Sequence, residues 1–157
     1  MNPIAHYLQP EDICLDVETT SKADLLDAIG RHMERAHSLP HQSVTHALSR
    51  REKLGSTGLG LGVAIPHARV ATLNRVLAAY LRLKTPIPFD APDGAPVTHI
   101  LVLLVPKEAS DEHLIILAAA SEMFANSRFR DHLLESGEVS TVKRLFDGWP
   151  DAPARVA

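Results

Sequence analysis

Cysteine, aromatic residues and an excess of either charge are all scarce in this sequence, and each scarcity excludes a class of protein. Cys14 is the single cysteine among 157 residues, so no disulfide can form within the chain, which is typical of a reducing cytoplasm. Aromatic residues make up 4% of the chain, and 16 basic against 19 acidic residues give a formal charge of −3. A nucleic-acid surface needs a basic face and often stacking rings, so we expect no nucleic-acid partner.

Long hydrophobic runs are also missing. The apolar run from Ile100 to Val105 is far shorter than the roughly 20 residues that a membrane helix needs. Residues 1–10 lack the basic start and the sustained apolar core of a signal peptide. We therefore expect a cytoplasmic protein without membrane insertion.

The apolar residues that are present predict strands of two kinds. Alternating residues predict a half-buried strand at about 13–17, and the two faces of residues 76–83 predict an amphipathic strand. Val63 to Ile65 predicts a shorter strand. The unbroken run at 100–105 predicts a central strand that is covered on both faces.

Helical spacing predicts the elements that cover these strands. We expect a helix capped by Ser21, a second over about 41–53, and three more after Ser110, which would cap the first of the three. The fold class is therefore α/β, a single-domain sandwich of a mixed β-sheet flanked by helices. We expect the domain to span residues 1–149 and a C-terminal tail to occupy 150–157.

The segment from Arg50 to Arg69 concentrates glycine and leads to a histidine, His67. It contains four glycines within eight positions: Gly55, Gly58, Gly60 and Gly62. Such a run needs backbone with positive φ or a close approach to another group. Neither the Gly-x-x-x-x-Gly-Lys-Ser/Thr motif nor the spacing of a dinucleotide loop is present, so we expect no nucleotide cofactor.

Histidine chemistry is the remaining possibility. The nine histidines of the chain include no pair with zinc-site spacing and an acidic helper, so we expect no metal. A neutral imidazole is, however, a good nucleophile near physiological pH and can carry a phosphoryl group. His67 follows Pro66, which restricts one side of the ring. On this local pattern alone, a turn histidine without chemistry remains open.

Groups that could hold a phosphoryl group lie at three places along the chain. Arg51 continues the buried stripe of the helix at 41–53 and can hold an anion. His113 would lie in the first turn of the helix that follows Ser110, at its positive end. The loop residues Ser56, Thr57 and Gly58 could support the phosphate.

Four motifs resemble one known family. Arg51-Glu-x-Leu-Gly-Ser-Thr-Gly-x-Gly-x-Gly-Val-Ala-Ile-Pro-His67 is similar to the active-site signature of the mannitol/fructose-type enzyme IIA domains of the bacterial phosphoenolpyruvate-dependent phosphotransferase system. Pro86-Ile-x-Phe-Asp-Ala-Pro-Asp-Gly-x-Pro-Val, then Leu103-Leu-Val-Pro and His113-Leu, resemble its nitrogen-regulatory branch. The resemblance covers roughly Ile4 to Phe146, and departs mildly at Ile115 and Ile116.

The resemblance implies a role for each site residue. His67 would accept a phosphoryl group, on Nε2, from a small histidine phosphocarrier protein. His113 would donate a hydrogen bond to that group, and Arg51 would stabilise the charge that develops during transfer. A visiting protein would need an apolar collar, for which Leu59, Leu61, Val63 and Ala68 are available: this last expectation comes from the residue types alone.

The implied function is a regulatory enzyme IIA, a stoichiometric phosphohistidine carrier whose phosphorylation state controls target proteins that the sequence does not name. The lack of an attached IIB or membrane IIC segment favours this reading. A sugar-transport IIA that passes phosphate to a fructose/mannitol-type IIB is the alternative. A protein-binding module that is never phosphorylated is a second alternative.

Overall fold

The computed structural model describes residues 2–108 and 111–150, apart from the side chain of Glu112. Its elements, in chain order, are α1 (Pro3–Tyr7), β1 (Leu8–Val17), α2 (Lys22–His37), α3 (His41–Lys53), β2 (Gly58–Gly60), β3 (Val63–Ala64), β4 (His67–Val70), β5 (Leu77–Ile87), β6 (Val97–Pro106), α4 (Glu112–Ala125), α5 (Ser127–Glu135) and α6 (Val139–Gly148). The expected cap Ser110 and residues 151–157 of the expected tail lie outside the described residues. Within the described ranges, no helix is long and apolar enough to cross a membrane.

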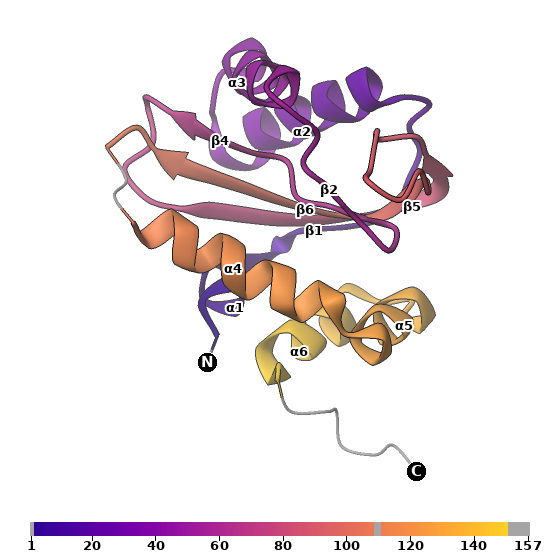
Figure 1. Cartoon of the computed structure of the whole chain (residues 1–157). Coiled ribbons are helices and arrows are strands. Elements are labelled where there is room, and N and C mark those ends of the chain that lie inside the picture. Colours follow the sequence, from indigo (N-terminus) through magenta and orange to yellow (C-terminus); the bar gives the residue numbers. More distant parts are fainter. Residues whose placement is uncertain (1, 109–110, 151–157) are drawn as a thin grey trace.

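The strands form one mixed six-stranded sheet in the order β1-β5-β6-β3-β2, with β4 also paired to β6. β1 runs parallel to β5, β5 runs antiparallel to β6, and both β3 and β4 run parallel to β6. Figure 1 shows α2 and α3 on one face of the sheet and α1, α4, α5 and α6 on the other. The predicted α/β sandwich is confirmed.

Both faces of the central strands are buried, and this explains the patterns in the sequence. On β5, Leu77, Ala79 and Leu81 pack with the core under α2 and α3, whereas Ala78 and Tyr80 pack with the core under α4 to α6. Every residue of β5 from 77 to 83 is buried, so the expectation of an amphipathic strand there is wrong. On β6 every residue from 99 to 105 is buried, as predicted. The unbroken apolar run was therefore the sequence feature that predicted β6.

A local signal set the start of α2, whereas pairing between distant segments set the extent of β1 and β4. The Ser21 side chain accepts a hydrogen bond from Asp24 N at 3.1 Å, so the predicted cap of α2 is confirmed. In contrast, β1 begins at Leu8, five residues before the predicted start at 13, and β4 was not predicted. Pairing with β5 and β6 extends these segments, and no local pattern reports such pairing.

Candidate phosphoryl-transfer site

His67 begins β4, where it lies opposite Leu103 of the central strand β6. Its Nδ1 is 2.8 Å from the carbonyl oxygen of Ile65. Because a carbonyl oxygen can only accept, Nδ1 must carry the proton and donate it. The lone pair of the neutral ring therefore sits on Nε2, which makes Nε2 the nucleophilic atom.

The surroundings of His67 favour this neutral ring. Burial lowers its pKa below the ordinary value of 6.5, and the positive charge of Arg51 acts in the same direction. The hydrogen bond to Ile65 and the charge of Glu52 oppose this shift but do not reverse it. At neutral pH the ring is an uncharged nucleophile.

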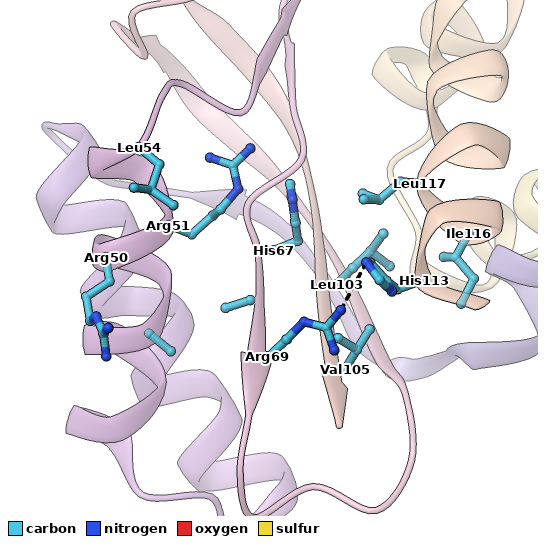
Figure 2. A pocket seen from close by; sticks show the side chains of 12 residues that line it. Arg50, Arg51, Leu54, His67, Arg69, Leu103, Val105, His113, Ile116 and Leu117 are labelled. Carbon is cyan, nitrogen blue, oxygen red and sulfur yellow. Dashed lines mark hydrogen bonds between the residues drawn. The ribbon is translucent and has the colours of Figure 1, made fainter. Parts of the chain in front are cut away.

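A pocket of about 510 Å³ brings the predicted residues together. Its charged and titratable lining residues are Arg50, Arg51, His67, Arg69 and His113, and apolar residues from α3, β4, β6 and α4 complete it. Figure 2 shows that the arginines and histidines enter from three elements, α3, β4 and α4. Arginines and histidines separated by up to 63 positions in the chain thus face one cavity, which concentrates positive charge around a nucleophilic ring.

Arg51 lies in the last turn of α3, where it is half-buried. Its Nη1 donates to Gly55 O at 2.9 Å, so the glycine loop holds the guanidinium at the pocket wall. Arg50 also lines the pocket but is exposed. The helical spacing that selected Arg51 over Arg50 as the inward residue agrees with this difference in burial.

The loop residues Ser56, Thr57 and Gly58 are not among the residues that line this pocket. The Ser56 hydroxyl donates to Phe89 O at 2.7 Å and accepts from Gly58 N at 3.0 Å. The Thr57 hydroxyl and backbone N–H both donate to the carboxylate of Glu52. In this structure the two hydroxyls hold the loop in shape, and a direct role on phosphate stays a prediction.

Gly58 itself is required by close packing. A Cβ added there would lie 3.0 Å from Ala91 Cβ and 3.1 Å from Ala91 Cα, tighter than ordinary van der Waals contact. Glycine at this position lets the loop pack directly on the segment after β5.

Arg69 was missed in the sequence. It lies two residues after His67 on β4, so both side chains stand on the same side of the strand. Its Nη1 donates to Lys107 O at 2.9 Å, and its Nη2 lies 3.4 Å from His113 Nε2. The two-residue period would have revealed it, had the segment after Pro66 been predicted as a strand.

The expected apolar collar is partly wrong. Val63 is 1% exposed and packs in the core, so it cannot meet a visiting protein, whereas Leu59 and Leu61 are exposed. Larger exposures occur at Leu54, at 84%, and at Ile115, at 63%. Leu54 lines the pocket and Ile115 lies two residues after His113, so helix ends supply much of the apolar surface near the site.

A metal centre is not apparent in the described part of the chain. No group of three or more His, Cys, Asp or Glu side chains there is arranged to hold a metal ion. The arrangement suits acid–base and nucleophilic chemistry at nitrogen, with guanidinium groups to stabilise an anion.

Comparison with known proteins agrees with this chemistry. Residues 6–148 match the family described as "Phosphoenolpyruvate-dependent sugar phosphotransferase system, EIIA 2". A nitrogen regulatory protein of Pseudomonas aeruginosa is 41% identical over 133 residues, covering 83% of this chain and 85% of that protein. One of Escherichia coli K12 is 40% identical over 112 residues, covering 70% and 68%.

Solved structures give the same result. The nitrogen regulatory protein IIA-Ntr from Neisseria meningitidis superposes with a TM-score of 0.86 at 42% identity, covering 92% of this chain and 99% of that one. IIA mannitol from Escherichia coli shares the fold at 18% identity, with a TM-score of 0.74 over 87% of this chain and 96% of that one. The chain therefore belongs to the EIIA 2 family of the phosphoenolpyruvate-dependent sugar phosphotransferase system.

Within that family, the similarity places the chain in the nitrogen-regulatory branch, as the motifs at 86–97, 103–106 and 113–114 predicted. It is thus a phosphotransferase component of this system.

Proposed function

We propose that this protein accepts a phosphoryl group on His67 Nε2 from a small histidine phosphocarrier protein, and that its phosphorylation state then regulates target proteins in the cytoplasm. The observation that carries the proposal is the bond from His67 Nδ1 to Ile65 O, which commits one ring nitrogen and leaves the other as the nucleophile in an arginine-lined pocket. The proposal needs no metal or cofactor.

The transfer step follows from these roles. The Nε2 lone pair of His67 attacks the phosphorus on the donor's histidine, while the phosphorus–nitrogen bond of the donor breaks and its electron pair returns to the donor ring. The Nδ1 proton of His67 stays in its hydrogen bond to Ile65 O. Positioning and electrostatics supply most of the catalysis in such an in-line transfer.

Arg51 has the role of stabilising the charge that spreads over the phosphoryl oxygens in the transition state. It lines the pocket with His67, and its contact with Gly55 O holds one side of the guanidinium in place. His113, on the opposite wall, has the role of donating a hydrogen bond to the phosphoryl group once that group is on His67. A pre-arranged cationic pocket lowers the reorganisation that the transfer requires.

The direct test is a transfer assay with radiolabelled phosphoenolpyruvate, enzyme I and the histidine phosphocarrier. We expect stoichiometric label on the wild-type chain, none on His67→Ala, and full label on the control His46→Ala, since His46 is exposed on α3 and does not line the pocket. Absence of label on the wild type would refute the proposal and favour a protein-binding module. Label that survives in His67→Ala would refute His67 as the acceptor.

A second arm separates regulation from sugar transport. Adding a fructose-type IIB to the labelled protein should leave the label in place if the chain is regulatory. Rapid loss of label to the IIB would instead favour the transport alternative.

A further inference from the structure

Arg69 connects the strand that carries His67 to the start of α4. Its Nη1 donates to Lys107 O at 2.9 Å, just after β6, and its Nη2 lies 3.4 Å from His113 Nε2. Figure 2 marks the second contact and shows the guanidinium pointing across the pocket toward His113. One side chain thus contacts two positions on the far wall of the site.

The chemistry of this contact fixes the proton on His113. A guanidinium can only donate hydrogen bonds, so Nε2 of His113 acts as the acceptor and its lone pair faces Arg69. In that arrangement His113 cannot donate from Nε2. The hydrogen bond to a phosphoryl group that the proposed function asks of His113 therefore requires a different state of this ring, or the use of its other nitrogen.

A phosphoryl group on His67 would compete for the same guanidinium. Residues two apart on a strand are separated by about 7 Å and project to the same side, well within reach of an arginine. His67 and Arg69 both line the pocket. A charge-assisted bond from a guanidinium to a phosphoryl oxygen is stronger than a 3.4 Å contact to a neutral imidazole nitrogen.

We propose that Arg69 is a positioning residue that changes partner with the phosphorylation state, holding His113 Nε2 in the unphosphorylated protein and the phosphoryl oxygens in the phosphorylated one. When Arg69 leaves, His113 Nε2 takes a proton from solvent while Nδ1 releases its proton to solvent, so the neutral ring becomes the Nε2–H tautomer and can donate from Nε2. This inference rests on the proposed function, because it concerns the protein with a phosphoryl group on His67.

The change of partner by Arg69 would also affect the surface of α4. Leu114 and Ile115, next to His113 in the first turn, are 56% and 63% exposed. Arg69 anchors the Lys107 carbonyl and His113 on either side of this turn's entry. Loss of the contact to His113 would loosen an exposed apolar turn, which is a surface that a target protein can use to distinguish the two forms.

The tautomer of His113 tests the proposal, because a purely structural role of Arg69 predicts no change in it. In the full chain with ¹⁵N-labelled histidine, imidazole nitrogen shifts should show His113 mainly as the Nδ1–H form in the unphosphorylated wild type. Arg69→Gln should increase the Nε2–H form, and phosphorylation of the wild type should change His113 in the same direction. Arg69→Lys should give an intermediate result, since one ammonium group replaces a fork of donors.

Arg35→Gln is the matched control, because Arg35 is exposed on α2 and does not line the pocket. It should leave the His113 signals unchanged. Amide hydrogen exchange at Leu114 and Ile115 should speed up on phosphorylation of the wild type, and should already be fast in unphosphorylated Arg69→Gln.

The outcomes separate this inference from the proposed function. Identical His113 signals in unphosphorylated wild type and Arg69→Gln overturn the inference, whether or not the protein accepts phosphate. Unchanged His113 signals on phosphorylated His67 overturn it while leaving the proposed function intact. If the phosphocarrier does not label the chain, phosphoramidate supplies the phosphoryl group chemically, and failure of both donors to modify His67 overturns both proposals.

Discussion

At the scale of the residue, the two histidines of the pocket differ in what holds them. His67 donates from Nδ1 to a backbone carbonyl of its own segment, Ile65 O, so the contact depends little on the rest of the fold. His113 contacts Arg69, a side chain 44 positions away in the sequence. The proposed nucleophile is therefore held by local geometry, whereas the second ring depends on a long side chain that the proposed phosphoryl group would attract.

Arg51 provides a prediction at this scale. Arg51→Gln should slow phosphoryl transfer to His67 by about 100-fold, the usual cost of removing one group that stabilises developing charge. It should also raise the pKa of His67, because the Arg51 charge adds to burial in lowering that pKa. A quenched phosphoryl-transfer assay measures the rate of transfer to His67. An NMR titration of the His67 ring measures its pKa.

Lys53→Gln is the control for this substitution. Lys53 is exposed, lies in the same turn of α3 and does not line the pocket, so both quantities should stay at the wild-type values. Equal transfer rates in Arg51→Gln and Lys53→Gln would contradict the role given to Arg51.

At the scale of elements, Glu52 joins the end of α3 to the glycine loop and to α2. Its carboxylate accepts from Thr57 N at 3.2 Å and from the Thr57 hydroxyl, and it lies 3.0 Å from Lys22 Nζ. Lys22 also pairs with Asp90 at 3.1 Å, after β5. With 6% of its side chain exposed, Glu52 has little access to water and depends on these partners.

Glu52→Gln should therefore destabilise the protein by about 2 kcal/mol, the typical worth of hydrogen bonds to a charged group. The amide keeps the shape of the carboxylate but loses its charge and can accept at one oxygen only. The urea midpoint of unfolding measures the change. Glu11→Gln, at an exposed position of β1, is the control and should leave the midpoint unchanged; a matching loss in both variants would remove this role from Glu52.

At the scale of the whole molecule, the helical layers on the two faces of the sheet each bury a histidine. The pKa values of these two histidines shift in opposite directions. On the α2 face, the hydrogen bond to Asp12, 2.7 Å from His32 Nε2, raises the pKa of His32 to about 9. On the α4 to α6 face, burial lowers the pKa of His99 to about 4, and Tyr80 Oη lies 2.7 Å from its Nδ1. The two groups predict opposite limbs of the pH dependence of stability.

The signs follow from proton binding in the two states. Between pH 6.5 and about 9 the folded protein binds more protons at His32 than the unfolded chain does, so stability falls as pH rises. Between about 4 and 6.5 it binds fewer protons at His99, so stability falls as pH drops. These two groups alone give a maximum near pH 6.5.

Urea midpoints measured from pH 5 to 9 test this profile. The midpoint should decline on both sides, His32→Gln should flatten the alkaline limb, and His99→Gln should flatten the acid limb, even if either variant is less stable throughout. An alkaline limb that persists in His32→Gln would show that another group causes it.

The sequence predicted much of this architecture because its signals were local. The Ser21 cap, the two faces of β5 and the apolar run of β6 each follow from residues within one segment. β4 was missed because its four residues carry no strand pattern of their own and exist as a strand through pairing with β6. Arg69 was missed for the same reason, because its side chain is known to lie on the same side as His67 only once β4 is known to be a strand.

By itself, the sequence determined the family, the α/β class and the placing of Arg51, His67 and His113 around one pocket, because a contiguous motif and a helical period encode them. Only the tertiary structure decided that Ile65 O holds the Nδ1 proton of His67, that Ser56 and Thr57 turn their hydroxyls to Phe89 and Glu52, and that Arg69 reaches His113. The physical reason is that a hydrogen bond is made by atoms that meet in space, and a sequence records which groups can donate or accept but not which of them meet.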